Sequence, residues 1–338
     1  MTAEDILKDL KNRKFKPLYL LHGEEPYYID LVGNYVEHQL LSDADKGFNQ
    51  TVLYGKDTEI MTVLGAAKRY PMMADYQVVL VKEAQDMKWG KDDDDKKSIN
   101  PLLNYLENPL PSTILVFCYK YGKFDKRKKT YKAIEKNGLI FESTSLYDNK
   151  IPGWIESFTT DKGYRISQQA TYMLSEYLGN DLSKIANELE KLMLNVSAGQ
   201  EITLELVQNN IGISKEYNVF ELQTALGKKD VFKVNQIVNY FEANPKANPI
   251  VLVLGNLNNF FSKVLAFHYI KDRSNIAREL GVSPYFVKDY EQAARSYDYG
   301  KTMRIISYLR EYDLKSKGVD SNAEDGALLK ELMFKILH

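Results

Sequence analysis

Five short apolar runs, separated by longer mixed segments, occupy the first 145 residues and constrain the fold more than any other feature of the chain. Each run is rich in Val, Ile, Leu, Phe or Tyr and is short enough for a strand that is buried on both faces. Strands that alternate with helical segments are typical of a parallel sheet with helices on both sides. The runs begin at Pro17 (PLYLLHG), Asn49 (NQTVLYG), Tyr76 (YQVVLVKE), Ser112 (STILVFCY) and Gly138 (GLIFES).

The segments between these runs, and almost the whole chain from Ser167 onward, have the spacing of amphipathic helices. The segment NDLSKIANELEKLML has Asn180 or Asp181 as its N-cap. The piece SAGQEIT, from Ser197, predicts a helix stop and a turn, and a further helix is expected to begin at Thr203. The predicted buried faces are Ile60, Val63, Leu64 and Ala67 in the first part of the chain and Leu182, Ile185, Ala186, Leu189, Leu192 and Met193 in the second.

These patterns predict three domains. Residues 1–145 form an α/β domain, residues 146–211 form a helical domain, and residues 212–338 form an all-helical domain. Gly227 and the segment EANPKANP interrupt the last of these, and each proline there opens or closes a helix. The acidic piece KDDDDKK, from Lys91, is expected to be a solvated loop.

Composition excludes several classes of function. The 45 basic and 46 acidic residues nearly cancel, so no global field attracts the chain to nucleic acid or to a membrane. The single cysteine, Cys118, lies inside an apolar run, which favours a core position over a nucleophile and suits a reducing cytosol. No stretch approaches the roughly 18 apolar residues of a membrane span. The N-terminus lacks the form of a signal peptide, so a cytoplasmic protein is predicted.

Gly23 ends the first apolar run where a phosphate-binding loop would begin. A working loop cradles phosphates with backbone amides, reaches the outer phosphates with a lysine and holds magnesium with a hydroxyl. In this chain the positions of the required Gly-Lys-Ser/Thr hold Tyr28, Ile29 and Asp30. The loop therefore lacks the residues that bind a nucleotide. The four histidines are scattered without a second ligand at metal-binding spacing, so no metal site is indicated either.

The charges around this loop also disfavour a nucleotide. Glu24 and Glu25 would place two carboxylates beside a triphosphate. After the third apolar run, Lys82 and Glu83 stand where a magnesium-binding Asp-Glu pair would be expected. The sheet thus has the layout of a P-loop ATPase without its reactive residues, although a doubly wound fold that never bound nucleotide would look the same.

Several segments resemble the delta subunit of bacterial DNA polymerase III. They occur in the family's order, from about residue 16 to residue 338, and the spacing of Asp313 and Lys317 fits as well. The resemblance implies a clamp-loader subunit that binds and opens the sliding clamp, with an ATPase-like (AAA+) fold in residues 1–145, a helical lid and a C-terminal collar that oligomerises. The matching segments are KPLYLLHGEEPYYID, GKFDKRKKTYKAIEKNGLIFES, GNDLSKIANELEKL and EYNVFELQTALGKKD.

The same resemblance implies partners and no cofactor. The expected partners are the sliding clamp (the beta subunit), the ATPase subunits tau or gamma and the delta-prime subunit through the collar, and primed DNA in the assembled complex. That complex has DNA-directed DNA polymerase activity, a nucleotidyltransferase reaction, whereas no polymerase carboxylate pair is visible in this chain. The resemblance also implies that the loop at Gly23, Glu24 and Glu25 is a degenerate nucleotide loop.

A pair of methionines is the predicted clamp-binding site. Pro71 is expected to end the preceding helix, and the next strand begins only near Tyr76, so Met72 and Met73 should lie on or beside a turn. In the delta family this position carries two large apolar residues that insert into a pocket of the clamp, leucine and phenylalanine in some relatives. The alternative is that both methionines seal the helix against the sheet.

Between Lys120 and Lys136 lie eight basic residues and two acidic ones. Clustered cations neutralise phosphates, so this segment is a candidate contact with primer-template DNA. The alternative is a solvated helix that follows the fourth strand. The candidate DNA contacts are Lys123, Lys126, Arg127, Lys128 and Lys129.

The segment from Ser274 to Ser296 has the spacing of a helix-turn-helix, with a recognition helix that would start near Ser283. That helix would present Tyr285, Phe286, Asp289 and Glu291, and only Lys288 would suit a nucleic acid. A packed helix pair in the collar is therefore favoured. Two alternatives to a clamp-loader subunit stay open at this point: an ATPase of the same fold with an unusual loop, and a helix-turn-helix regulator.

Overall fold

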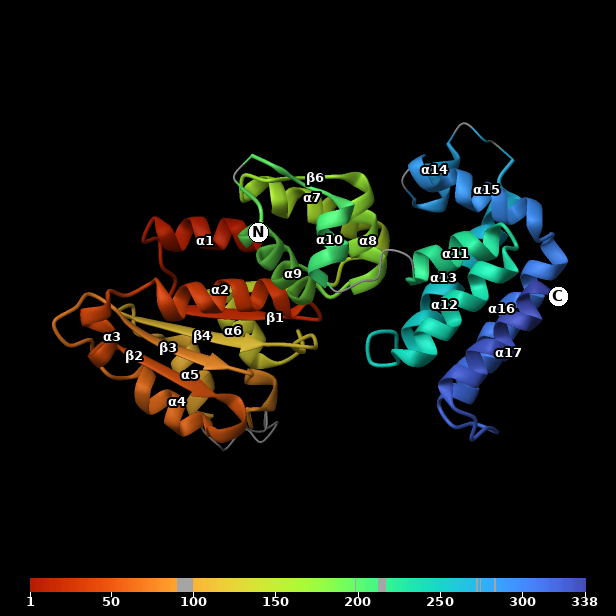
Figure 1. Cartoon of the computed structure of the whole chain (residues 1–338). Helices are drawn as coiled ribbons and strands as arrows, with labels where there is room; N and C mark the ends of the chain where they lie inside the picture. Colours follow the sequence, from red (N-terminus) through yellow and green to blue (C-terminus); the bar gives the residue numbers. More distant parts are fainter. Residues whose placement is uncertain (90–99, 198, 212–216, 272, 274, 283) are drawn as a thin grey trace. The chain divides into compact units, whose positions relative to one another are not determined.

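The structure is a computed structural model that describes residues 1–89, 100–197, 199–211, 217–271, 273, 275–282 and 284–338 (Figure 1). The chain divides into two compact units, Met1–Leu146 and Tyr147–His338. The predicted acidic loop at 91–97 and the predicted boundary at 212 lie outside the described residues. The division into three domains stays a prediction.

The first unit is built on a parallel sheet with the strand order β2-β3-β4-β1-β5 among its described residues. All five predicted strands are confirmed, and every neighbouring pair is parallel. Because β1 lies between β4 and β5, the chain crosses over the sheet after its first strand, as in doubly wound folds. The strands are β1 (Leu18–Gly23), β2 (Gln50–Tyr54), β3 (Gln77–Lys82), β4 (Thr113–Tyr119) and β5 (Leu139–Ser143).

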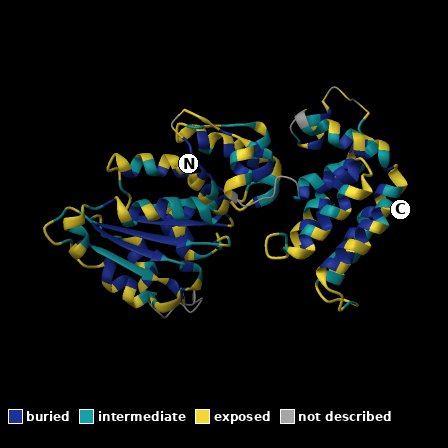
Figure 2. Cartoon of the chain, viewed as in Figure 1, coloured by how far each residue is buried: buried dark blue, intermediate teal, exposed yellow. Residues whose placement is uncertain are grey.

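Helices cover both faces of this sheet, whose inner strands are buried (Figure 2). Side chains that alternate along the strands contribute to two separate buried cores, one on each face. On one face, α1 and α2 pack against Leu21, Leu80 and Val116. On the other, α4, α5 and α6 pack against Leu20, Val79 and Phe117. The helices of the unit are α1 (Ala3–Lys11), α2 (Pro26–His38), α3 (Asp43–Asn49), α4 (Ile60–Ala67), α5 (Pro101–Glu107) and α6 (Lys129–Asn137), with short 3₁₀ turns at Gly55–Asp57 and Ala84–Asp86.

Cys118 lies in β4 and is buried between the sheet and α2, as predicted. Burial raises the pKa of its thiol to about 12. Because only the thiolate is a strong nucleophile, the native thiol is unreactive near neutral pH.

Two details of the first unit differ from the prediction. The edge strand β2 is only partly buried, because it has a neighbouring strand on one side alone. Helix α4 ends at Ala67, before the predicted stop at Pro71. The reason lies in other elements: the Thr113 hydroxyl (3.0 Å) and the Tyr105 hydroxyl (3.2 Å) both donate to the Ala67 carbonyl and take the place of the next helical turn.

The first part of the second unit is mainly helical. In α9 the six predicted apolar residues are all buried, and Asp181 is the N-cap. The predicted turn around SAGQEIT is wrong in one respect, because Glu201–Ile202 forms the short strand β7 beside β6. A two-residue ladder is too short to show a period in the sequence. The elements are α7 (Ile151–Asp161), β6 (Arg165–Ile166), α8 (Gln168–Leu178), α9 (Leu182–Leu194), β7 (Glu201–Ile202) and α10 (Leu204–Ile211), with a 3₁₀ turn at Asp148–Lys150.

From residue 217 onward the described residues form helices joined by turns and loops, with no strand among them, and these helices share one core. Helix α13 is central in it and packs against α11, α15 and α16. The helices are α11 (Val219–Gly227), α12 (Val231–Ala243), α13 (Ile250–Tyr269), α14 (Ile276–Leu280), α15 (Val287–Ser296), α16 (Tyr299–Ser316) and α17 (Asp325–Leu337), with a 3₁₀ turn at Pro284–Phe286.

Helix α13 corrects one expectation from the sequence. Among the described residues it is the one helix that is long and apolar enough, at 20 residues, to cross a membrane. Its apolar side chains Leu257, Phe261 and Val264 are fully buried in the helical core. The core of this unit therefore accounts for its composition.

Candidate functional site

The two predicted clamp-binding methionines lie on an exposed loop, residues 68–76, which connects α4 to β3 without helix or strand and which we call the methionine loop. The Met72 side chain is 60% exposed and Met73 is 104% exposed, while Pro71 is half-buried beside them. Tyr70 is also exposed. The methionines therefore do not seal α4 against the sheet, and the loop presents two large apolar side chains to solvent.

The methionine loop is held in place from both sides. On one side the buried Asn49, at the end of α3, accepts from the Met72 N–H (2.6 Å) and donates to the Met72 carbonyl (2.9 Å). On the other side Gln77, at the start of β3, donates to the Arg69 carbonyl. Met73 has a φ of +54°, in the left-handed region that costs a residue other than glycine about 1 kcal/mol or more.

The second candidate, the loop between β1 and α2, is shaped by the neighbouring strand β5. Gly23 has a φ of +147°, and a Cβ placed there would lie 1.8 Å from the carbonyl oxygen of Ser143. The Gly23 carbonyl accepts from the Gly122 N–H at 3.0 Å. A glycine at this position is therefore required by the packing of backbones and gives no sign of a nucleotide by itself.

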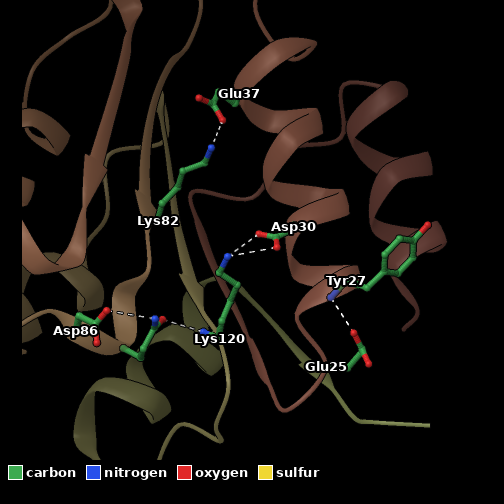
Figure 3. Close-up of polar contacts among 8 residues, drawn as sticks. Glu25, Tyr27, Asp30, Glu37, Lys82, Asp86 and Lys120 are labelled. Atoms are coloured by element: carbon green, nitrogen blue, oxygen red, sulfur yellow. Dashed lines mark hydrogen bonds and ion pairs between the residues drawn. The ribbon is translucent and has the colours of Figure 1, made fainter. Parts of the chain in front are cut away.

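A carboxylate of the chain itself occupies the start of α2. Glu25 is the N-cap of this helix, is 4% exposed and accepts from the Tyr27 N–H at 2.9 Å (Figure 3). Helix N-termini attract anions because their first N–H groups lack helical partners and the helix dipole is positive there. At this helix the anion is Glu25.

Ion pairs lie across the carboxyl edge of the sheet next to this loop. Lys120, after β4, contacts both carboxylate oxygens of Asp30 at 3.1 and 3.2 Å, and its N–H donates to the Gln85 side chain at 3.0 Å (Figure 3). Lys82, at the end of β3, pairs with Glu37 of α2. Asp30, at the hydroxyl position of a phosphate loop, and Lys82, at the position of a magnesium-binding carboxylate, are thus each paired with a side chain of the chain itself.

The sequence matches two families of known proteins. Residues 19–144 match the family "DNA polymerase III, delta subunit", and residues 216–336 match "DNA polymerase III delta subunit, C-terminal domain". The DNA polymerase III subunit delta of Bacillus subtilis is 25% identical over 333 residues, which cover 97% of this chain and 94% of that protein. The chain belongs to the DNA polymerase III delta subunit family.

Other delta relatives agree with this assignment. The probable DNA polymerase III subunit delta of Aquifex aeolicus is 25% identical over 227 residues, which cover 66% of this chain and 63% of that protein. The solved structure of the Bacillus subtilis DNA clamp loader delta protein covers 99% of both chains with a TM-score of 0.57 and 24% identity. The delta fold therefore extends over both units of this chain.

The basic segment of this delta-family chain carries carboxylates as well as cations. Lys126 pairs with Glu142 at 2.7 Å, and Lys123 lies 3.7 Å from both Glu142 and Glu24. Arg127 pairs with Asp125 at 2.8 Å and, through that hydrogen bond, holds the pKa of Asp125 down at about 2. Lys128 lies over the Phe124 ring, and Lys129 is the exposed first residue of α6.

Two features expected in the C-terminal helices are an ion pair on the surface and a helix pair packed into the core. Asp313 and Lys317 pair along α16 at 2.7 Å, as their spacing suggests. In the helix-turn-helix candidate, α15 buries Tyr290 and Ala293 in the core of the bundle, which is the packing expected of a structural helix pair. The predicted start of the recognition helix at Ser283, and the side chain of Tyr285, lie outside the described residues.

Sequence reasoning named the methionines and the β1–α2 loop but missed the residues that hold them. Asn49 and Gln77 act on the methionine loop from neighbouring elements, and Lys120 reaches Asp30 across 90 residues. No motif marks an asparagine or a glutamine at the edge of a strand, so the signal for these residues is purely three-dimensional.

Proposed function

We propose that this clamp-loader delta subunit binds the sliding clamp through Met72 and Met73 and opens it for loading onto primed DNA. The observation that carries the proposal is the exposure of both adjacent side chains on a loop that is pinned at Met72. Apolar side chains displayed together on a loop that is hydrogen-bonded at its backbone favour an apolar pocket on a partner over solvent. Methionine, which is flexible and polarizable, suits such a pocket.

The size of the effect follows from burial. Transferring one methionine side chain from water to a pocket is worth roughly 1.5 to 3 kcal/mol. For two methionines the sum is about 3 to 6 kcal/mol. Because losses at an interface are rarely additive, we expect a loss of about 3 kcal/mol. That corresponds to about a hundredfold in affinity.

The test is the double change Met72→Ala with Met73→Ala. Affinity for the sliding clamp of the same organism should fall by about a hundredfold, while the melting temperature barely changes because both side chains are exposed. Met61→Ala is the matched control, since Met61 is also exposed but lies on α4 outside the loop. Unchanged affinity of the double variant would reject the contact, and a large fall in its melting temperature would assign the pair to the core.

We also propose that the chain has no ATPase site of its own. Glu25 supplies the anion at the start of α2, and Asp30 and Lys82 are paired with Lys120 and Glu37. A triphosphate would have to displace a buried carboxylate with which it shares the sign of its charge. Equilibrium binding of a labelled ATP analogue to the isolated chain should show no saturable binding in the micromolar range, and such binding would favour the ATPase alternative.

Contact with primed DNA is a second proposal, and it rests on the exposed basic segment. The five candidate cations of this segment lie near three carboxylates, those of Glu24, Asp125 and Glu142, so this surface carries a net positive charge. Exposed pairs of this kind are weak, and a phosphate can replace a carboxylate as the partner. Changing Lys126, Arg127, Lys128 and Lys129 to alanine should reduce DNA-stimulated clamp loading most strongly at raised salt; full activity there would reject the contact.

A further inference from the structure

The methionine loop has a shape that its own sequence does not enforce. Met73 stands in the left-handed region, and the loop contains neither helix nor strand. Residues other than glycine stay in that region only when the surroundings determine their conformation. A determinant outside the loop is therefore needed to keep the two exposed side chains in one arrangement.

Two side chains outside the loop supply it: Gln77 holds Arg69 at the start of the loop, and Asn49 holds Met72, beside the left-handed Met73. Asn49 lies 23 residues before Met72 in the sequence, and its side chain is 3% exposed. Its oxygen accepts from the Met72 N–H at 2.6 Å, and its nitrogen donates to the Met72 carbonyl at 2.9 Å. Both backbone groups of one residue are thus satisfied by a single amide, an arrangement that needs a donor and an acceptor on the same side chain.

We infer that Asn49 is a positioning residue for clamp binding, which fixes the methionine loop in its binding conformation before the partner arrives. The inference rests on the proposed contact through Met72 and Met73. A loop that is already ordered loses less conformational freedom when it binds, so holding the loop in its binding conformation raises the affinity for the clamp. Asn49 itself lies beneath the loop and needs no contact with the clamp.

The experiment compares two variants of the full chain with a matched control. Asn49→Leu removes the donor and the acceptor at similar size, and Asn49→Asp keeps an acceptor but sets a carboxylate against the Met72 carbonyl. Each should weaken binding to the sliding clamp of the same organism by about tenfold, the effect of losing one or two hydrogen bonds. Asn34→Asp, at an exposed position of α2, makes the same change of charge in the same unit and should alter affinity less than about twofold.

A double-mutant cycle separates positioning from general destabilisation. In the background of Met72→Ala with Met73→Ala, Asn49→Leu should cost less than about twofold in affinity, because no side chains remain to be positioned. The exchange rate of the Met72 amide, measured without clamp, should rise at least about tenfold in Asn49→Leu because its acceptor is lost.

The results separate the methionine contact with the clamp from the positioning role of Asn49. Full affinity of Asn49→Leu with the methionines present overturns the inference, and so does an equal loss in both backgrounds, which would indicate a merely structural role. If the double alanine variant itself binds normally, the methionine contact fails and the inference falls with it. If the methionines matter and Asn49 does not, the proposed function survives alone.

Discussion

Gly23 closes β1 where its φ of +147° and the Ser143 carbonyl leave no room for a side chain. We expect Gly23→Ala to destabilise the first unit by at least about 3 kcal/mol, since the added carbon would force two strand ends apart. Gly65→Ala is the control, because nothing lies within 4 Å of that position in α4; it should be neutral or stabilise by about 0.5–1 kcal/mol.

Urea unfolding can be followed in the first unit alone. The two tryptophans, Trp89 and Trp154, lie in different units, so Trp89 fluorescence in a Trp154→Phe background reports on the sheet. A Gly23→Ala variant with unchanged stability would show that the backbone at this loop is free to move. In that case the glycine would need another explanation.

His22, beside this glycine, predicts a dependence of stability on pH. Its Nδ1 accepts from the Phe124 N–H at 3.2 Å in a buried site. Burial lowers the pKa of His22, and Lys126 and Lys123 lower it further, while Glu142 opposes them. His22 therefore takes up a proton at a lower pH in the folded state than in the unfolded state, so stability is lost as the pH falls below about 6.5.

The effect is a larger loss of stability between pH 7.5 and pH 5.5 than the chain would show without His22. His22→Asn keeps an acceptor for the Phe124 N–H without a titrating ring, so its urea midpoint should fall less over that range than that of the unchanged chain. His38→Asn, at an exposed position, should behave like the unchanged chain. Identical pH profiles for all three would contradict the assignment to His22.

At the scale of elements, α4 ends because residues of other elements stop it. Thr113 donates to the Ala67 carbonyl and accepts from Gln77 at 2.8 Å, in a fully buried position. Thr113→Val keeps the shape and removes both bonds, so it should destabilise the first unit by about 1–3 kcal/mol.

The matched control for this change is Thr51→Val. The Thr51 hydroxyl accepts from Arg69 at 2.9 Å at the surface, and its loss should cost less than about 0.5 kcal/mol. Trp89 fluorescence during urea unfolding measures both variants. Equal effects of the two substitutions would mean that the buried hydroxyl contributes nothing particular to the end of α4.

The elements that sequence could predict are those whose signal is local. Buried parallel strands appear as continuous apolar runs, and α9 repeats its apolar face over six positions, so both were found. The end of α4 depends on a hydroxyl 46 residues away, and β7 is two residues long, so neither left a periodic trace. The methionine pair was found from its place before a strand and from the family resemblance, whereas Asn49 could be found only in three dimensions.

At the scale of the whole molecule, the helical part from residue 217 has a core of its own, and residues 216–336 match the C-terminal domain of the delta family. We predict that deleting residues 212–338 abolishes assembly with the other clamp-loader subunits and leaves clamp binding intact. Pull-down with the purified subunits measures the first effect, and titration with the clamp measures the second. Assembly that persists after the deletion would count against the collar as the oligomerisation surface.

The buried Cys118 allows transient opening of the first unit to be measured through the rate at which its thiol is labelled. Because the sequence has one cysteine, any covalent labelling by a thiol reagent occurs in the sheet of the first unit and nowhere else. The reagent can enter only when β4 separates from α2, so the labelling rate measures how often that layer opens. A partner that binds only the closed domain must slow this rate in proportion to its occupancy, which turns clamp binding into a measurement on an otherwise unmodified protein.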